Sequence, residues 1–285
     1  MNFRRPWCGK RKQASLPVPK IPRTLERLKL FSDLLNPFAM RSLIPALLVL
    51  FFGASVFASF DENKGLVAYF SFNHCDARDD SGQGSYGQLL GNVRCWCGVE
   101  DDGLLLDGAD ARVVFSGTIN HYFTTSDFTL SFYFKPESRQ VFPQSLVSKR
   151  AACDEDNVLD IAYNATLAEL TTDFKESEYK LYHELSPEVQ GTGWQHYALV
   201  REGVYARTYL NGKLVRESRR CSGIDLSNEA PFSIGDSPCL ETGRMRRFQG
   251  VIDELRLYER ALSEEEILQL YLLYPVENAQ MDCLS

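Results

Sequence analysis

The sequence predicts an all-β protein, an antiparallel jelly-roll β-sandwich with one short C-terminal helix. From residue 65 onward the chain consists mostly of short apolar and aromatic runs separated by Gly, Asp, Asn and Pro, which is typical of strands and turns. An Asn211-Gly212 pair lies between two such runs, and helical spacing stands out in a single segment near the C-terminus. A sandwich of roughly 200 residues is an ordinary single domain.

The first half of this region contains four clear strand candidates. Residues 66–72 and 128–134 are rich in apolar, β-branched and aromatic side chains, which favour strands, and Pro136 ends the second run. Residues 103–108 lead into a further strand at 111–115. Repeated short strands favour a sandwich over alternating β-α units.

The second half opens with a strand that ends at Arg201 and continues into a hairpin at residues 209–215. Asn-Gly readily adopts positive φ at both central positions of a type I′ turn, so Asn211 and Gly212 predict a two-residue hairpin loop.

The C-terminal helix is predicted to begin after Ser263. The Ser263 hydroxyl and the Glu266 side chain form a capping-box pattern, and acidic residues in the first turn suit the helix dipole. The residues that recur at helical spacing are Ile267, Leu270, Tyr271 and Tyr274, and Pro275 ends the helix.

An apolar run at residues 43–57 precedes the predicted domain. Small residues up to Ala58 fit a signal-peptidase site, so residues 40–58 are a signal peptide or a signal anchor, and Met40 would be a conventional start. The basic residues 1–39 are then either an upstream extension from a misplaced start codon or a cytoplasmic segment before an uncleaved anchor. In both interpretations the following domain is secreted or exposed at the cell surface.

Net charge is distributed unevenly along the chain. Residues 1–58 carry +8 and the whole chain carries −7, so residues 59–285 carry −15. Such an acidic body would be repelled by phosphate backbones, which excludes nucleic acid as a partner. Membrane contact is expected only if residues 43–60 are an uncleaved anchor.

Seven of the eight cysteines follow the apolar run, and an exported β domain uses cysteines mainly in disulfides. We expect Cys75 to pair with Cys95 or Cys97, and Cys221 to pair with Cys239. Cys283 is the candidate for the odd cysteine. The spacing of Cys95 and Cys97 lacks the two intervening residues of a zinc knuckle.

Five segments in order resemble the laminin-G-like domain of the concanavalin A-like lectin/glucanase superfamily. The resemblance covers residues 62–274 and implies a jelly roll over 59–275 with a tail at 276–285. Tyr133 stands where the family commonly has Trp, and residues 151–190 depart from the pattern. The matching segments are 66–82, 103–115, 127–136, 193–215 and 248–263.

This resemblance implies a calcium ion. Asp253 matches the aspartate near the last strand, and the early turn supplies Asn73, Asp79 and Asp80. The alternative is that Asp253 caps a strand end and accepts hydrogen bonds from loop amides. A second candidate calcium site is the loop with Asp154 and Asp156, although acidic loops are commonly just solvated.

Two arginine-rich segments, 216–220 and 244–247, are either a docking surface for an anionic partner or charged strand edges. Trp96 and Trp194 are sugar-stacking platforms or core residues, with the core as the default. His196 is expected to be a buried histidine that bonds a neighbour. Asn164-Ala165-Thr166 is a glycosylation sequon, meaningful in a secretory pathway that glycosylates such sites.

Catalytic patterns are missing from the sequence. It has no E-x-D-x-x-E strand, no G-x-S-x-G elbow and no H-E-x-x-H. We therefore expect a non-catalytic module that binds a carbohydrate or glycoconjugate. The alternatives are a cell-surface protein-protein interaction or adhesion domain and, second, a degenerate glycosidase.

Overall fold

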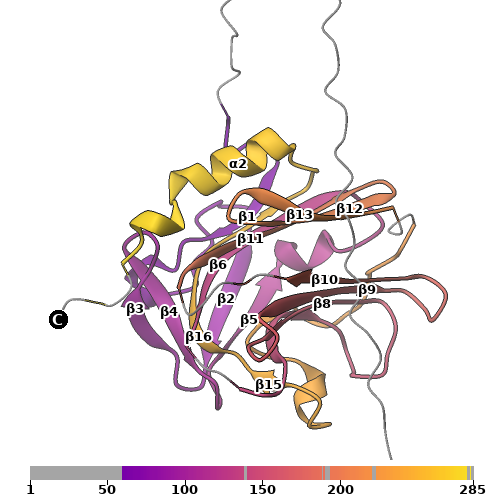
Figure 1. Ribbon diagram of the computed structural model, residues 1–285, viewed down its shortest axis with the longest axis horizontal. Helices are drawn as coiled ribbons and strands as arrows, with labels where there is room; N and C mark the ends of the chain where they lie inside the picture. Colours follow the sequence, from indigo (N-terminus) through magenta and orange to yellow (C-terminus); the bar gives the residue numbers. More distant parts are fainter. Residues whose placement is uncertain are drawn as a thin grey trace, which may run out of the picture. The chain divides into compact units, whose positions relative to one another are not determined.

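The computed structural model describes residues 60–285 except 138–139, 188, 190–192, 220–222, 281–282 and 284–285. Within this part, two sheets pack face to face and one α-helix follows them near the C-terminus, as Figure 1 shows. The predicted fold class is therefore confirmed. The predicted extension 1–39, the segment 40–58 and its apolar run lie outside the described residues. No helix within the described part is long and apolar enough to cross a membrane.

The first sheet has β16 (Gln249–Tyr258) near its centre, with β6 (Phe128–Pro136) on one side. On its other side β16 pairs with β4 through residues 249–252 and with β1 through residues 255–258. The remaining strands in this sheet are β1 (Leu66–Phe70), β3 (Arg94–Cys97), β4 (Asp102–Asp107), β11 (Gln195–Glu202), β12 (Tyr205–Leu210) and β13 (Lys213–Ser218).

The second sheet runs in the order β10-β9-β8-β7-β14-β5-β2, and β15 (Arg246–Arg247) adds to β7 in parallel. Three consecutive antiparallel strands at one side of this sheet, β8, β9 and β10, lie within residues 151–190, which depart from the family pattern. The strands are β2 (Ser85–Leu90), β5 (Arg112–Gly117), β7 (Gln144–Lys149), β8 (Val158–Asn164), β9 (Glu169–Lys175), β10 (Leu181–Pro187) and β14 (Ser233–Ile234).

The core between the sheets is rich in phenylalanine. Phe70 of β1 meets Phe115 of β5 edge to face, with 4.7 Å between the ring centroids. Phe123 stacks on Phe232 at 5.1 Å, and all four rings are almost completely buried. These contacts join the first sheet to the segments that surround β5 and β14.

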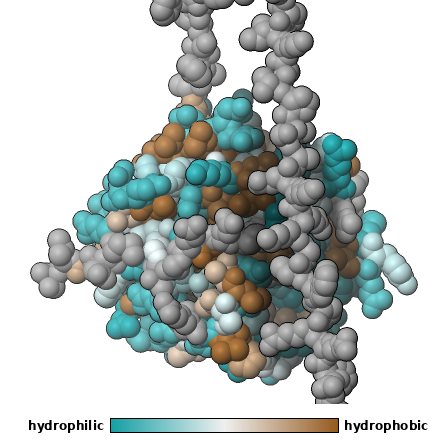
Figure 2. Space-filling model, in the orientation of Figure 1, coloured by the Kyte–Doolittle hydropathy of each residue, from teal (hydrophilic) through white to brown (hydrophobic). Residues whose placement is uncertain are grey.

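Helix α2 (Glu264–Leu273) covers the outer face of the first sheet. The predicted capping box is present, with Ser263 Oγ accepting from the Glu266 amide and the Glu266 carboxylate accepting from the Ser263 amide. The helix buries the predicted stripe of Ile267, Leu270 and Tyr271. Its other side leaves Leu268 and Leu272 exposed, and Figure 2 shows hydrophobic surface on this part of the molecule.

The predicted hairpin is also confirmed. Asn211 and Gly212 have φ values of 49° and 73°, as a type I′ turn requires, and connect β12 to β13. The short helical turns are η1 (Asn73–Cys75), η2 (Thr118–His121), η3 (Pro238–Leu240) and η4 (Val276–Asn278).

Three disulfides join described cysteines: Cys75–Cys95, Cys97–Cys283 and Cys153–Cys239, with Cα–Cα distances of 5.1, 5.4 and 4.7 Å. The first is one of the two pairings left open for Cys75. The predicted Cys221–Cys239 pairing is wrong, because Cys239 in η3 lies against the loop after β7 that carries Cys153. Cys283 is not the odd cysteine either, since it closes on β3; Cys221 lies outside the described residues.

Peptide mapping under non-reducing conditions will test this pairing. We expect a linked peptide that contains Cys153 and Cys239. It will disappear in Cys153→Ser and persist in the control Cys221→Ser. Loss of the bond will lower the free energy of unfolding by roughly 2–5 kcal/mol. A Cys221–Cys239 peptide from the native protein would contradict the structure.

Candidate functional site

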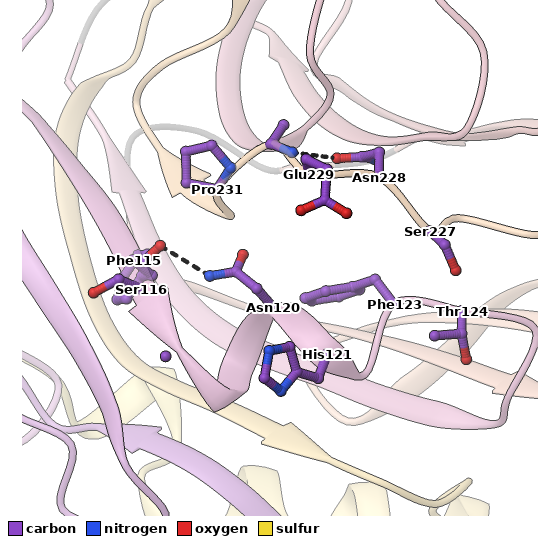
Figure 3. A pocket seen from close by; sticks show the side chains of 12 residues that line it. Phe115, Ser116, Asn120, His121, Phe123, Thr124, Ser227, Asn228, Glu229 and Pro231 are labelled. Atoms are coloured by element: carbon purple, nitrogen blue, oxygen red, sulfur yellow. Dashed lines mark hydrogen bonds between the residues drawn. The ribbon is translucent and has the colours of Figure 1, made fainter.

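Two neighbouring hollows lie on either side of the segment Ser227–Pro231, and both are lined by Glu229, Ala230 and Pro231. The first, called here the binding hollow, has a volume of about 700 Å³ and the second about 670 Å³. Figure 3 shows the binding hollow. Its lining residues are Phe115, Ser116, Gly117, Asn120, His121, Phe123, Thr124 and residues 227–231.

Asn120 fixes one wall of the binding hollow. Its Nδ2 donates to the Phe115 carbonyl at 3.0 Å, and its Oδ1 accepts from the Phe232 amide at 2.7 Å. Both ends of this amide side chain are therefore engaged in joining η2 to β5 and to the segment before β14. Its role is to shape the wall.

Lys149 holds the segment Ser227–Pro231, which forms another wall of the binding hollow. Its buried Nζ donates to the carbonyls of Asn228 and Ala230 at 3.0 and 2.8 Å, and to Asn228 Oδ1 at 3.3 Å. Burial lowers the pKa of this ammonium group below its ordinary value. Asn228 in turn donates to the Asn157 carbonyl at 2.6 Å, so the segment is held from β7 and from the residue that precedes β8.

Glu229 and His121 line the binding hollow with exposed polar groups, and the Glu229 carboxylate interacts electrostatically with the Lys149 ammonium. Both side chains are exposed, and neither forms a hydrogen bond or ion pair within the described part of the chain. Figure 3 shows the Glu229 carboxylate directed into the space above Asn120 and Phe123, with His121 across from it. A carboxylate accepts hydrogen bonds from hydroxyl groups, and an imidazole both donates and accepts.

The second hollow has a different character. Its Asp236 carboxylate pairs with Arg112 at 3.2 Å and with Arg247 at 2.6 Å, and Glu229 and Glu241 also line it. Neither hollow was predicted from the sequence. Glu229, His121 and Lys149 are isolated residues with no motif around them, and only the fold brings them together.

Asp253, the first predicted calcium ligand, is fully buried where β16 changes partner from β4 to β1. Its Oδ2 accepts from the Val99 amide at 2.7 Å, and its Oδ1 accepts from the Glu254 amide at 2.9 Å. Burial, with a smaller contribution from Glu254, holds the pKa of this carboxyl well above its ordinary value. These contacts are those of the alternative role, a strand-end cap for loop amides.

The other predicted calcium ligands divide into two groups. Asn73 Oδ1 accepts from the Asp102 amide at 3.1 Å, beside an acidic hollow formed by residues 98–102. Asp79 instead accepts from the Tyr69 and Ser85 amides, and Asp80 accepts from the Ser71 hydroxyl. The predicted set of four therefore does not form one ligand shell.

Among the described residues, the side chains of Cys75, Cys95 and Asp102 form a group of potential metal ligands close enough to share an ion. The two cysteines are joined in a disulfide, so they are not available as thiolates. In the second candidate loop, Asp154 pairs with Arg244 at 2.6 Å and Asp156 pairs with Lys175 at 2.7 Å. Both carboxylates of that loop are partly exposed and already have cationic partners.

The two arginine segments lie on different sheets. Arg216 and Arg219 belong to or follow the edge strand β13, whereas Arg246 and Arg247 form β15 beside β7. Arg220 lies outside the described residues. The described arginines of the two segments therefore do not make one basic surface.

His196 and Trp194 are structural. His196 is completely buried, with Nε2 2.8 Å from Ser131 Oγ, and burial together with nearby Arg256 lowers its pKa to about 3. Trp194 is buried against Trp96, and its Nε1 donates to the Gln280 carbonyl at 3.1 Å. Both tryptophans lie in an apolar cluster under the C-terminal segment.

A buried ion pair lies next to Asp253. The Glu254 carboxylate accepts from Arg256 at 2.7 Å and from the Tyr69 hydroxyl at 2.9 Å. Burial outweighs the attraction of Arg256 and raises the pKa of Glu254 to about 7. The Arg256 guanidinium also lies over the Tyr69 ring, 4.2 Å from its centroid.

Comparison with known proteins supports the same fold. A family model described as the concanavalin A-like lectin/glucanases superfamily matches residues 107–268. No curated protein matches the chain.

Three solved structures illustrate the likeness. The binding domain of Paraclostridial mosquitocidal protein 1 has a TM-score of 0.61 and 18% identity, over 74% of this chain and 53% of that one. Domain 4 of AbnA, a GH43 extracellular arabinanase from Geobacillus stearothermophilus in complex with arabinotriose, has a TM-score of 0.58 and 19% identity, over 72% and 98%. The botulinum neurotoxin DC binding domain in complex with rat synaptotagmin II has a TM-score of 0.60 and 13% identity, over 75% and 52%.

This chain thus spans about half the length of the two toxin domains and nearly all of the arabinanase domain. At these identities the likeness concerns the fold.

The buried Glu254 predicts a pH dependence of stability. Between pH 4.5 and about 7 the native protein keeps a proton on Glu254 that the unfolded chain has released. Its contribution to stability is therefore fully present below pH 4.5 and is lost as the pH rises through 7. The free energy of unfolding changes by about 3 kcal/mol, because each pKa unit between the native and unfolded states corresponds to 1.36 kcal/mol.

Denaturant unfolding of wild type and Glu254→Gln across this pH range measures the effect. The stability of wild type relative to the variant will fall by that amount as the pH rises. His196 titrates in the opposite sense in both proteins and cancels in the comparison. A difference that stays constant with pH would contradict the protonated state of Glu254.

Proposed function

Because the chain belongs to the concanavalin A-like lectin/glucanases superfamily, we propose that its domain is an exported, non-catalytic module that binds a carbohydrate or glycoconjugate. The observation that carries the proposal is the binding hollow, where the exposed Glu229 and His121 make no hydrogen bond or ion pair within the described part of the chain, while hydrogen bonds of Asn120 and Lys149 fix the walls around them. A preformed concave site with a few free polar groups is the usual form of a small-ligand site.

The chemistry of the hollow suits a sugar. Glu229 and His121 offer acceptors and a donor for hydroxyl groups, and Ser116 adds a hydroxyl at the rim. The exposed Pro231 provides apolar surface beside them. The arabinanase domain with the same fold, solved with arabinotriose, lends support to an oligosaccharide ligand.

Binding without catalysis is the second part of the proposal. Glycoside hydrolysis commonly needs two carboxyl groups that flank the scissile bond. Glu229 is the single carboxylate among the residues that line the binding hollow. The second hollow is lined by Glu229, Asp236 and Glu241, and its Asp236 is held by two arginines.

The third part of the proposal is that the domain is exported. Three disulfides within one β domain favour an oxidising compartment. The apolar run at residues 43–57 supplies the expected signal.

A glycan array followed by titration calorimetry with the best oligosaccharide tests the binding site. Glu229→Ala and His121→Ala will each weaken binding, and Glu229→Ala will do so by roughly 10–100-fold because it removes a charge-assisted hydrogen bond. The control Glu178→Ala changes an exposed carboxylate outside the hollow and will bind like wild type.

Equal affinity of all three variants would place the ligand elsewhere. If no sugar binds and a protein co-purifies with the domain, the interaction-domain alternative replaces this proposal. The complex of the neurotoxin domain with synaptotagmin II shows that a neighbour of this fold binds a protein.

We also propose a calcium ion, but at a different set of ligands from the predicted one, which keeps Asn73 and leaves out Asp79 and Asp80. Asn73 adjoins the acidic hollow that contains Glu100, Asp101 and Asp102, and Asp253 bonds the amides of the same loop. Carboxylates and backbone oxygens of a loop suit this hard cation. Asp79 and Asp80, by contrast, are engaged in the turn after β1.

Melting curves with calcium and with excess chelator test the ion. Calcium at a hundredfold excess over its dissociation constant will stabilise the domain by about 2.7 kcal/mol. The shift will vanish in Asp101→Asn and persist in the control Asp80→Asn. Identical curves with calcium and chelator would remove the ion from the proposal.

A further inference from the structure

The chain has one N-x-S/T sequon, Asn164-Ala165-Thr166, and the structure places it in the turn between β8 and β9. Asn164 is the last residue of β8 and pairs with Glu169, the first residue of β9. Its Oδ1 accepts from the amides of Thr166 and Leu167 at 3.1 and 3.2 Å. These bonds use the oxygen of the side-chain amide and leave its Nδ2 without a partner in the described part of the protein.

Exposed apolar residues surround this turn. Leu167 of the turn is 60% exposed and Val141 in the neighbouring loop is 75% exposed, whereas Phe142 of that loop, 46% exposed, already has the Arg246 guanidinium over its ring at 4.4 Å. The two loops are in contact, since Thr166 Oγ1 donates to the Gln140 carbonyl at 3.4 Å. Clustered exposed apolar residues on a soluble protein usually have a covering partner.

We propose that Asn164 carries an N-linked glycan that covers this apolar area. In the reaction, Asn164 Nδ2 forms a bond to C1 of the first sugar of a lipid-linked oligosaccharide pyrophosphate. The bond from C1 to the pyrophosphate oxygen breaks, the lipid pyrophosphate leaves with that electron pair, and the amide loses one proton. The chemistry is a group transfer and requires no oxidant or reductant.

The position is compatible with the rest of the fold. Neither the binding hollow nor the second hollow includes residues 140–142 or 164–168, so a glycan here leaves both open. The proposal requires the expected export of the chain and is independent of which ligand the binding hollow takes.

Cell-free translation of the full chain with eukaryotic microsomes tests the modification. Wild type will acquire one glycan, seen as a mobility shift that peptide N-glycosidase removes, and peptide mass spectrometry will find Asp in place of Asn164 after that treatment. Asn164→Gln and Thr166→Ala will show no shift. Thr166→Ser, which keeps the sequon, will be modified like wild type.

The covering role has its own measurement. Without its glycan, the purified protein will bind more of an apolar-surface dye, and Leu167→Ser will reverse part of that gain. A wild-type chain that remains unmodified with microsomes, whether or not it is translocated, overturns the proposal. A shift that persists in Asn164→Gln overturns the assignment to Asn164, and unchanged dye binding overturns the covering role.

Discussion

The first sheet depends on how β16 changes its partner from β4 to β1 at Asp253 and Glu254. At that point the register with β6 also shifts, and Glu254 adopts a φ of 54°. A buried gap between two partner strands leaves amides unpaired, and unpaired buried amides are costly. Asp253 meets this need by accepting from the amides of Val99 and Glu254.

The same change of partner strand places a second acidic side chain, Glu254, in the interior, where it needs a positively charged partner. Arg256 supplies it, because alternate residues of a strand share a face and Arg256 lies two positions beyond Glu254. The guanidinium then lies over Tyr69 and near Tyr274, which links β1 to the end of α2. Asp253, which the sequence predicts as a calcium ligand, and its neighbour Glu254 thus both stabilise the centre of the sheet.

The outer face of the first sheet is covered. On the first sheet, α2 and the C-terminal segment cover the face, held by the Cys97–Cys283 disulfide and by Trp194 on Gln280. The open hollows lie instead beside the Ser227–Pro231 segment, whose position depends on Lys149. The buried ammonium group shapes the hollow, and the neighbouring Glu229 side chain is exposed along its lining.

The sequence by itself determined the fold class, the hairpin at Asn211-Gly212 and the capped helix after Ser263, because each rests on local backbone preferences and on short-range periodicity. The tertiary structure decided the disulfide partners of Cys239 and Cys283 and the separation of Asp79 from Asp253. It also assembled the binding hollow from η2 and a segment more than 100 residues away. Such contacts depend on how distant loops fold over the sheets, and no local pattern in the sequence encodes them.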